Sequence, residues 1–257
     1  MIHGTIPSLS SFKTLQGIDL TLNLLRGTIP ELDNNLEIRS IKIAFNDLTG
    51  TIPESLRKLS NIKTLQLDEN KLSGCLPNWI GELKLLRALS LSKNVFHKSN
   101  IPISINNLHD LEYLDLSYTQ LTGYIPITNN AFPRLGYLLL YNNFLSGTFP
   151  NAITTCPNIK EIMLDMNILT GQLSTKISMM SSCEIFSVKG NEFSGSISPL
   201  LELVDLKHLS LGSNKLSGTI PLEIGNLKQL KTINLDSNNF TGAIPTTFSR
   251  LSLLGTW

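Results

Sequence analysis

The chain has 257 residues, of which 41% are hydrophobic and 16% are charged, and its formal net charge is +1. The charged residues are scattered, which argues against the basic stripe that follows a nucleic-acid backbone and against an acidic tail. No stretch approaches the roughly 18 consecutive apolar residues of a membrane helix, and the first residues lack the pattern of a signal peptide. We therefore expect no nucleic-acid partner and no membrane span in this chain.

One motif recurs along the whole chain with a period of 23 to 25 residues. The segments IKTLQLDENKLSGCLP (62–77) and LKTINLDSNNFTGAIP (230–245) show it most clearly. Each unit has one polar anchor, and the ten anchors, which number the coils one to ten, are Asn23, Asn46, Asn70, Asn94, Thr119, Asn143, Asn167, Asn191, Asn214 and Asn238. Because a unit of this size cannot bury a core alone, the units are expected to stack into a solenoid.

Within a unit, the first predicted element is a short strand. In coil three, Leu65 and Leu67 alternate with polar residues, which predicts leucines inside and polar side chains outside. Asn70 follows, where its amide can donate to and accept from the backbone of adjacent coils, forming a ladder along the anchors. The glycine and proline that come next shape the return of the chain, for which we expect single 3-10 turns and little α-helix.

Coils four and five depart from the pattern. Between Asn94 and Pro102 there is one extra residue and the usual glycine is replaced by Lys98, while Thr119 takes the anchor position in coil five. A hydroxyl has one donor where an amide has two, so these coils are expected to stack less regularly, with water or a shifted loop completing the hydrogen bonds. Neutral drift in a tolerant repeat is the alternative interpretation.

Beside this irregularity, four of the five tyrosines fall in one predicted patch on the outward strand face of coils five to seven. Tyrosine and methionine are enriched at the centres of interfaces, and the acidic residues would favour a partner that carries Lys or Arg. Alternatively, the tyrosines only cover the sheet by packing on one another. The concave patch predicted to bind a ligand consists of Tyr113, Asp115, Tyr118, Tyr137, Leu139, Tyr141, Glu161, Met163, Asp165 and Met166.

The remaining reactive side chains predict no catalysis. The four histidines lie on separate coils or loops, and none has metal-ligand spacing, so no catalytic, metal or cofactor site is expected. Cys156 and Cys183 stand where other coils have Leu or Ile and are expected in the core, whereas Cys75 occupies a variable position. The sequon NFT makes Asn239 a possible N-glycosylation site.

Both ends of the sequence fall within a unit. Residues 3–7 have the pattern of the tail of a coil, and residues 248–257 have that of a front. Since solenoid ends need polar caps, we expect residues 1–257 to be a single solenoid, truncated mid-repeat and without caps, that belongs to a longer protein. A truncated gene model is the alternative.

The consensus LxxLxxLxLxxNxLxGxIP, which recurs in ten coils with the departures described above, resembles the plant-type leucine-rich repeat family. The resemblance implies an α/β horseshoe-type solenoid, a right-handed superhelix with one parallel sheet on its concave face and 3-10 turns on its convex side. It also implies recognition of a peptide or protein, and the engagement of a co-receptor, by the extracellular region of a cell-surface receptor-like protein or receptor-like kinase. Any kinase domain would lie outside this chain. The alternatives are a secreted inhibitor of cell-wall-degrading enzymes and an intracellular scaffold.

Overall fold

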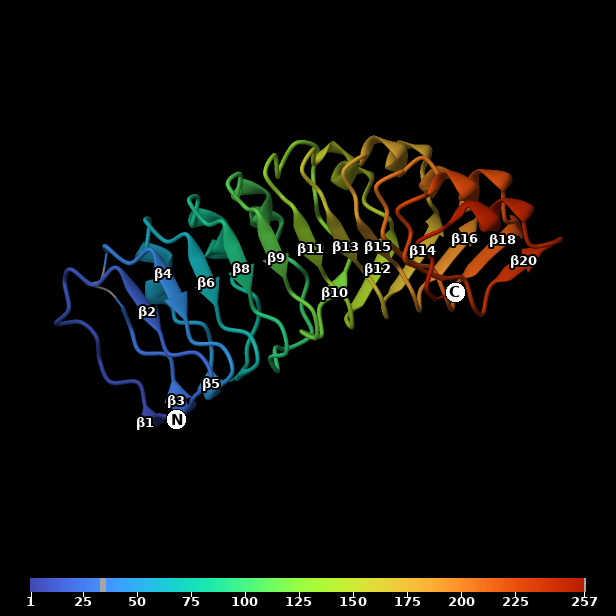
Figure 1. The fold of residues 1–257 in the computed structure, drawn as a ribbon. Coiled ribbons are helices and arrows are strands. Elements are labelled where there is room, and N and C mark those ends of the chain that lie inside the picture. Colours follow the sequence, from blue (N-terminus) through green and yellow to red (C-terminus); the bar gives the residue numbers. More distant parts are fainter. Residues whose placement is uncertain (33–35, 257) are drawn as a thin grey trace.

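The computed structural model describes residues 1–32 and 36–256. The chain forms an elongated, curved solenoid in which each repeat makes one coil, and the first and last strands lie at opposite ends (Figure 1). The fold predicted from the repeat is confirmed.

One strand per coil builds a ten-stranded parallel sheet on the concave face. Equivalent residues are in register, so that Leu89 of one coil pairs with Leu114 of the next. The strands in chain order are β2 (Gly17–Asp19), β4 (Ser40–Lys42), β6 (Thr64–Gln66), β8 (Ala88–Ser90), β9 (Tyr113–Asp115), β11 (Tyr137–Leu139), β13 (Glu161–Met163), β15 (Ile185–Ser187), β17 (His208–Ser210) and β19 (Thr232–Asn234).

A second set of strands, which the repeat pattern did not predict, follows the anchors along the side of the solenoid. A four-stranded sheet contains β1 (His3–Thr5), β3 (Leu24–Thr28), β5 (Asp47–Gly50) and β7 (Lys71–Leu72). A six-stranded sheet contains β10 (Thr122–Gly123), β12 (Phe144–Thr148), β14 (Ile168–Gln172), β16 (Glu192–Gly195), β18 (Lys215–Thr219) and β20 (Asn239–Thr241). The gap between these lateral sheets falls at coil four, where the sequence has its extra residue.

The convex side is made of short 3-10 helices. Proline commonly precedes them, with Pro53 at φ −64°, an angle that its ring favours. No α-helix occurs in residues 1–32 and 36–256. The 3-10 helices are η1 (Glu54–Lys58), η2 (Asn78–Glu82), η3 (Ile103–Asn107), η4 (Asn151–Thr155), η5 (Thr175–Met179), η6 (Ser198–Leu200), η7 (Leu222–Asn226) and η8 (Thr246–Arg250).

The core is one continuous column of aliphatic side chains inside the coils. Leu138 and Leu140 are fully buried, whereas the next residue, Tyr141, is partly exposed, as the alternation predicted. Cys156 and Cys183 lie in this core and Cys75 is exposed. Burial raises the pKa of Cys156 to about 11 and that of Cys183 to about 12, so both thiols stay protonated at neutral pH.

The anchor asparagines connect neighbouring coils by hydrogen bonds. Asn70 accepts a hydrogen bond from the Leu48 amide at 3.0 Å, and its Nδ2 donates to the carbonyl of Ile43 in the preceding coil at 3.0 Å. The same Nδ2 lies 3.1 Å from the Leu67 carbonyl of its own coil. Equivalent bonds link Asn46, Asn94, Asn143, Asn167, Asn191, Asn214 and Asn238 to the coils before them, and Asn23 accepts from Ile2.

Thr119 alters this ladder. Its hydroxyl donates to the Leu116 carbonyl in its own coil at 2.5 Å, and its backbone amide donates to Asn143 Oδ1 at 3.1 Å. Thr119 thus bonds within coil five and toward coil six. The concave sheet nevertheless continues through β8 and β9, so the irregularity is confined to the lateral side.

We predict that Asn167→Ala lowers the free energy of unfolding by about 2 kcal/mol, because it leaves the buried Leu145 amide without a partner and removes one of the two anchor hydrogen bonds to each of the Leu140 and Leu164 carbonyls. Asn226→Ala, at an exposed position of η7, serves as the control and should change it by less than about 0.5 kcal/mol. Chemical denaturation measures both values. Equal effects of the two variants would contradict a stabilising role of the ladder.

Candidate functional site

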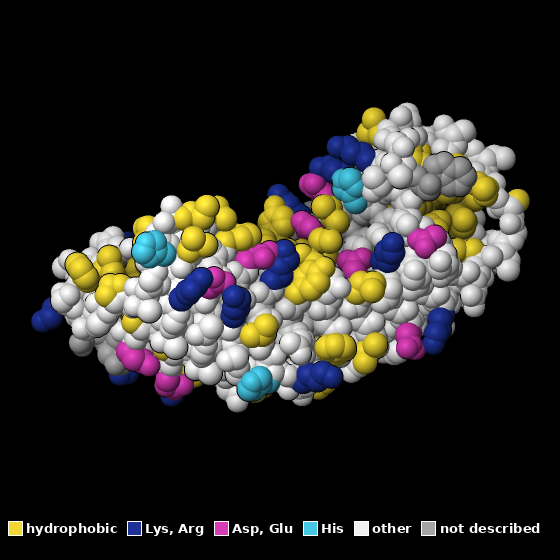
Figure 2. Space-filling view, turned by 90° about the horizontal axis from the view of Figure 1, so that it is seen from below, with side chains coloured by type: hydrophobic (Ala, Val, Ile, Leu, Met, Phe, Trp, Pro, Cys, Tyr) yellow, Lys and Arg dark blue, Asp and Glu magenta, His cyan; other side chains and the backbone are white. Residues whose placement is uncertain are grey.

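The residues of the predicted concave patch lie on three adjacent strands and at their ends. Tyr137 on β11 pairs with Tyr113 on β9 and with Glu161 on β13, and Leu139 pairs in the same way with Asp115 and Met163. The space-filling view shows the surface hollowed over the middle coils, with hydrophobic, acidic and basic side chains around the hollow (Figure 2). The structure therefore brings the predicted residues together.

The four tyrosines of the patch form two ring pairs. The ring centroids of Tyr113 and Tyr137 are 5.9 Å apart, and those of Tyr118 and Tyr141 are 5.5 Å apart at 83° between their planes. Such tilted and edge-to-face pairs are favourable aromatic arrangements and hold the side chains in place. Burial raises the pKa of Tyr113, so its phenol keeps its proton and can donate a hydrogen bond.

The rim of the patch depends on an unusual backbone conformation just before each anchor. Tyr118 has φ 52° and Met166 has φ 51°, and the residue before the anchor is left-handed in all ten coils. This turn carries the chain from the concave strand into the lateral strand and leaves the side chain outside, so that Tyr118 is 45% exposed and Met166 53%. Left-handed backbone costs about 1 to 2 kcal/mol in residues other than glycine, and the anchor hydrogen bonds offset it.

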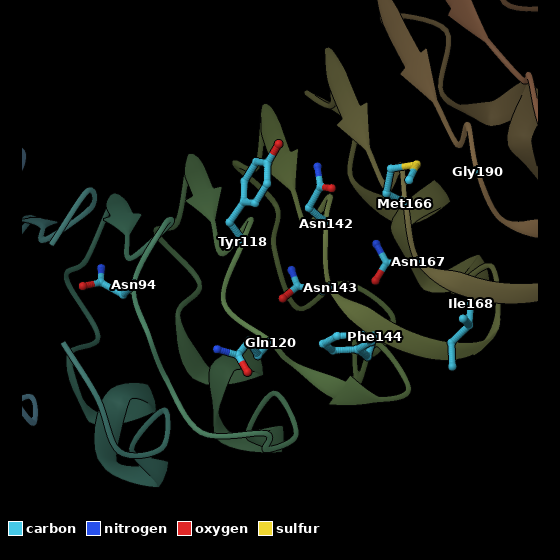
Figure 3. A pocket seen from close by; sticks show the side chains of 10 residues that line it. All are labelled: Asn94, Tyr118, Gln120, Asn142, Asn143, Phe144, Met166, Asn167, Ile168 and Gly190. Carbon is cyan, nitrogen blue, oxygen red and sulfur yellow. The ribbon is translucent and has the colours of Figure 1, made fainter. Parts of the chain in front are cut away.

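A groove of about 480 Å³ lies along this rim (Figure 3). Tyr118, Asn142 and Met166 form one row of side chains, and the second row consists of Gln120, Phe144 and Ile168 (Figure 3). Sequence reasoning missed Phe144 and Ile168, which begin β12 and β14. The available signal was an apolar residue directly after the anchor, where coils two, three, eight and nine have the charged residues Asp47, Lys71, Glu192 and Lys215.

The acidic residues of the patch differ in their surroundings. Asp115 is only 7% exposed, and its Oδ1 accepts hydrogen bonds from the Ser117 amide and hydroxyl, so it braces the end of β9. Asp165 Oδ1 accepts from the Ser187 hydroxyl and the Lys189 amide, whereas its Oδ2 is buried without a hydrogen-bond partner. Burial raises the pKa of Asp165 above its usual range.

A second groove, of about 530 Å³, continues the concave face over coils seven to ten. Its lining includes the apolar side chains of Met163 and Ile185 and polar side chains such as those of Glu161 and Asn234. Burial raises the pKa of Glu161. His208 also lines this groove, and its Nδ1 lies 2.8 Å from the Thr232 hydroxyl. Of the residues that line this groove, the predicted concave patch included only Glu161 and Met163.

The histidines of residues 1–32 and 36–256 lie on separate coils. No group of three or more His, Cys, Asp or Glu in these residues could hold a metal ion. The His109 ring contacts the Ala131 carbonyl and lies on a different coil from His208. None of the helices described has the length and apolar character that a bilayer crossing demands.

The buried carboxyl of Asp165 predicts a pH dependence. Because its folded pKa is raised, the folded state binds the proton more tightly, so this contribution to stability is complete below the unfolded value of 3.8 and is lost as the pH rises through the folded pKa. We predict that the free energy of unfolding of Asp165→Asn, measured relative to that of the native chain, increases from pH 3 to pH 7.

The matched control is Asp19→Asn, which should show the opposite sign. Hydrogen bonds from Thr21 lower the pKa of Asp19, so its carboxylate stabilises the fold above pH 3.8. The free energy of unfolding of Asp19→Asn, relative to that of the native chain, should therefore decrease as the pH rises. Denaturation curves at several pH values measure both trends. The same trend for the two variants would refute the assignment of a desolvated carboxyl at Asp165.

The comparisons with known proteins agree with this geometry. Two family models described as leucine rich repeat match residues 37–96 and residues 110–129, 205–227 and 229–251. A search of curated proteins found no match. Many solved structures are similar to the chain.

The chain is similar to the plant peptide hormone receptor RGFR1 in complex with RGF2, with 30% identity, a TM-score of 0.83, and coverage of 100% of this chain and 45% of the receptor chain. Similarity to PEPR1 in the PEPR1–AtPEP1 structure is comparable, with 31% identity, a TM-score of 0.84, and coverage of 99% and 39%.

A third similar structure is the ectodomain of the membrane receptor kinase GASSHO1/SCHENGEN3 from Arabidopsis thaliana, in complex with CASPARIAN STRIP INTEGRITY FACTOR 2. It shares 29% identity at a TM-score of 0.76, with coverage of 99% of this chain and 36% of the receptor chain. This chain therefore spans less than half the length of each of the three receptor chains. With ten stacked coils, the anchor ladder and the matching repeat models, the chain belongs to the leucine-rich repeat family.

Proposed function

We propose that this chain is the peptide-recognising part of the extracellular region of a receptor-like kinase or receptor-like protein. The observation that carries the proposal is the cluster of four tyrosines on β9, β11 and their strand ends, packed in two pairs in the hollow of the sheet. Tyrosine offers a large contact area at a small cost in conformational entropy, and its hydroxyl can donate or accept a hydrogen bond. A partner segment of suitable shape would find a rigid, partly apolar surface there.

An extended peptide suits this surface better than a small molecule. The patch and the second groove form a strip that crosses the strands from coil five to coil ten. Five steps of about 4.8 Å separate these coils, so the strip is about 24 Å long, which seven or eight extended residues would span. The carboxylates of Glu161 and Asp165 on this strip favour a peptide that carries Lys or Arg.

The ligands bound in similar structures support the proposal. Two of them are described as complexes of plant receptors with RGF2 and with CASPARIAN STRIP INTEGRITY FACTOR 2, and the first is called a peptide hormone receptor. By analogy, we propose a cell-surface location as part of a membrane-anchored parent. We also propose the rim groove, which shares Tyr118 and Met166 with the patch, as the contact for a co-receptor.

A phage-displayed library of random dodecapeptides, selected on the native chain, tests peptide recognition directly. For the best peptide, we predict that Tyr141→Ala or Tyr137→Ala weakens binding at least about tenfold, because interface tyrosines are commonly worth more than 1 kcal/mol. Thermal unfolding should hardly change, since both side chains lie on the sheet surface. Fluorescence polarisation of the labelled peptide measures the affinity.

Tyr124→Ala is the control for that experiment. Tyr124 is the fifth tyrosine, is 63% exposed and lies outside the concave patch, so its removal should leave the affinity unchanged. A library that yields no binding peptide, or affinities that do not distinguish Tyr141→Ala from Tyr124→Ala, would refute the proposal.

We also propose Asn239 as a glycosylation site, because it is exposed on β20 and begins the sequon NFT. Expression in a eukaryotic secretory host should give a glycoprotein whose mass falls on enzymatic deglycosylation, and Asn239→Gln should abolish the shift. An unmodified native chain from that host would contradict this assignment and weaken the case for an extracellular location.

A further inference from the structure

A row of like charges lies along one edge of the concave sheet in its N-terminal half. The residue directly before the concave strand is Arg39 in coil two, Lys63 in coil three and Arg87 in coil four. All three residues are exposed. Adjacent strands are about 4.8 Å apart, so the three positions extend over about 10 Å. We call these three residues the basic row.

The backbone holds the basic row in place. The Arg39 carbonyl accepts a hydrogen bond from the Lys63 amide at 2.7 Å, and the Lys63 carbonyl accepts one from the Arg87 amide at 2.8 Å. The strands that follow, β4, β6 and β8, are neighbours in one parallel sheet (Figure 1). The three charged positions are therefore fixed at the spacing of the strands.

The charges of the basic row are only partly compensated. Arg87 Nη1 lies 3.7 Å from Glu112 Oε1 of coil five. Arg39 and Lys63 have no ion-pair partner within residues 1–32 and 36–256. Like charges on neighbouring strands are destabilising, so the stability of the fold does not explain the row.

The same edge of the sheet is arranged differently in the C-terminal coils. Lys160, Lys207 and Lys231 take the equivalent positions there, and Glu184 stands between the first two. Lys207 Nζ lies 2.6 Å from Glu184 Oε2. The hydrogen bond from Lys207 lowers the pKa of Glu184, and the charges of Lys160 and Lys231 lower it as well. These lysines thus have a carboxylate among them, which the basic row lacks.

The surface next to the basic row is made of small side chains. Ser40, Thr64 and Ala88 begin β4, β6 and β8, and each is partly exposed. The next two strands have Tyr113 and Tyr137 at this position, and Tyr113 pairs in register with Ala88. An extended segment that lies on the tyrosines of the concave patch and continues across the strands therefore passes over these small residues, beside the basic row.

The acidic side chains of these coils leave the row available. Asp19 accepts a hydrogen bond from the Thr21 amide, and Glu69 at the opposite rim pairs with Lys93. Burial raises the pKa of Asp68, which favours its neutral form. A carboxylate brought by a partner would meet cations that have little competition from the chain itself.

We propose that the basic row binds an acidic segment of the peptide ligand. The ligand would then be polar in its charge, with carboxylates beside Arg39, Lys63 and Arg87 and with Lys or Arg over Glu161 and Asp165. Three or four extended residues cover the roughly 10 Å of the row, and each cation can donate charge-assisted hydrogen bonds to a carboxylate. The assignment rests on the proposed peptide recognition for its biological meaning, but the row can be tested without a selected peptide.

The test uses tetraglutamate with both ends blocked and, as its uncharged analogue, blocked tetraglutamine. Titrations of the ¹⁵N-labelled native chain, followed by NMR, should show saturable shifts at the backbone amides of Thr64 and Ala88 with tetraglutamate. Tetraglutamine should cause none. Added salt should weaken the binding of tetraglutamate, because it screens charges that are exposed.

Three variants locate the effect. Arg39→Gln and Lys63→Gln should each weaken tetraglutamate about threefold, as expected for the loss of one exposed ion pair. The double variant should weaken it about tenfold if the two effects add. Lys84→Gln is the matched control, because Lys84 is exposed just after η2 on the convex side and its loss should leave the affinity unchanged. Thermal unfolding should hardly change in any of them.

Several outcomes would overturn the assignment. These are equal binding of tetraglutamate and tetraglutamine, shifts confined to the surroundings of Lys160, Lys207 and Lys231, and equal affinities of Lys63→Gln and Lys84→Gln. Tetragalacturonate presents four carboxylates on a sugar chain and serves as the competing ligand. Tighter binding of this saccharide at the same amides would assign the row to an acidic polysaccharide and refute the acidic peptide.

The two proposals fail separately. If the dodecapeptide library yields no ligand but tetraglutamate binds beside the basic row, peptide recognition through the tyrosines is refuted and the anion-binding row stands. If peptides bind through the tyrosines without enrichment of Asp or Glu at one end, and Lys63→Gln does not weaken them, peptide recognition stands and the role of the basic row is refuted.

Discussion

The buried side-chain amide of the anchor asparagine is the interaction on which the rest of this structure depends. At Asn70, as at its equivalents, one oxygen and one nitrogen satisfy backbone groups of two successive coils in a place that water does not reach. This fixes the point where each strand leaves the sheet, and with it the alternation that sends Leu138 and Leu140 inward. Because every coil is held in the same way, the outward residues of neighbouring coils line up in columns at the spacing of the strands.

Because the buried asparagine ladder holds the coils together, residues on the concave surface are not required to stabilise the fold. The Asp165 carboxylate has an oxygen without a partner, and the Asn234 amide oxygen has none either. Both lie on the stretch that also carries the tyrosine pairs and the second groove. Unpaired buried acceptors cost free energy, and those of Asp165 and Asn234 lie on the strip that we propose for the peptide. The lateral side, in contrast, accommodates the extra residue of coil four with only a break in its sheet.

The repeat made much of this architecture predictable. Leucine alternation predicted the concave strands, the spacing of the anchors predicted the ladder, and the two together predicted that Tyr113 and Tyr137 would be neighbours. The lateral strands could not be inferred, because they contain glycine and serine and depend on the left-handed residue before each anchor. Alternation likewise predicted that Asp115 faces outward but not that Ser117, two residues later, would cover it. The absence of a side chain at Gly212 leaves room for the Asn234 and Asp236 side chains of the next coil, a close approach that a one-dimensional pattern does not specify.

The most direct test of this account is a crystal structure of the chain with a selected dodecapeptide bound. The account predicts an extended peptide that crosses the strands of the concave sheet, in contact with Tyr137 and Tyr141, with Leu140 in the core beneath them. A peptide seated on the 3-10 helices of the convex side, or a chain in which Leu140 faces solvent and Tyr141 the interior, would contradict it.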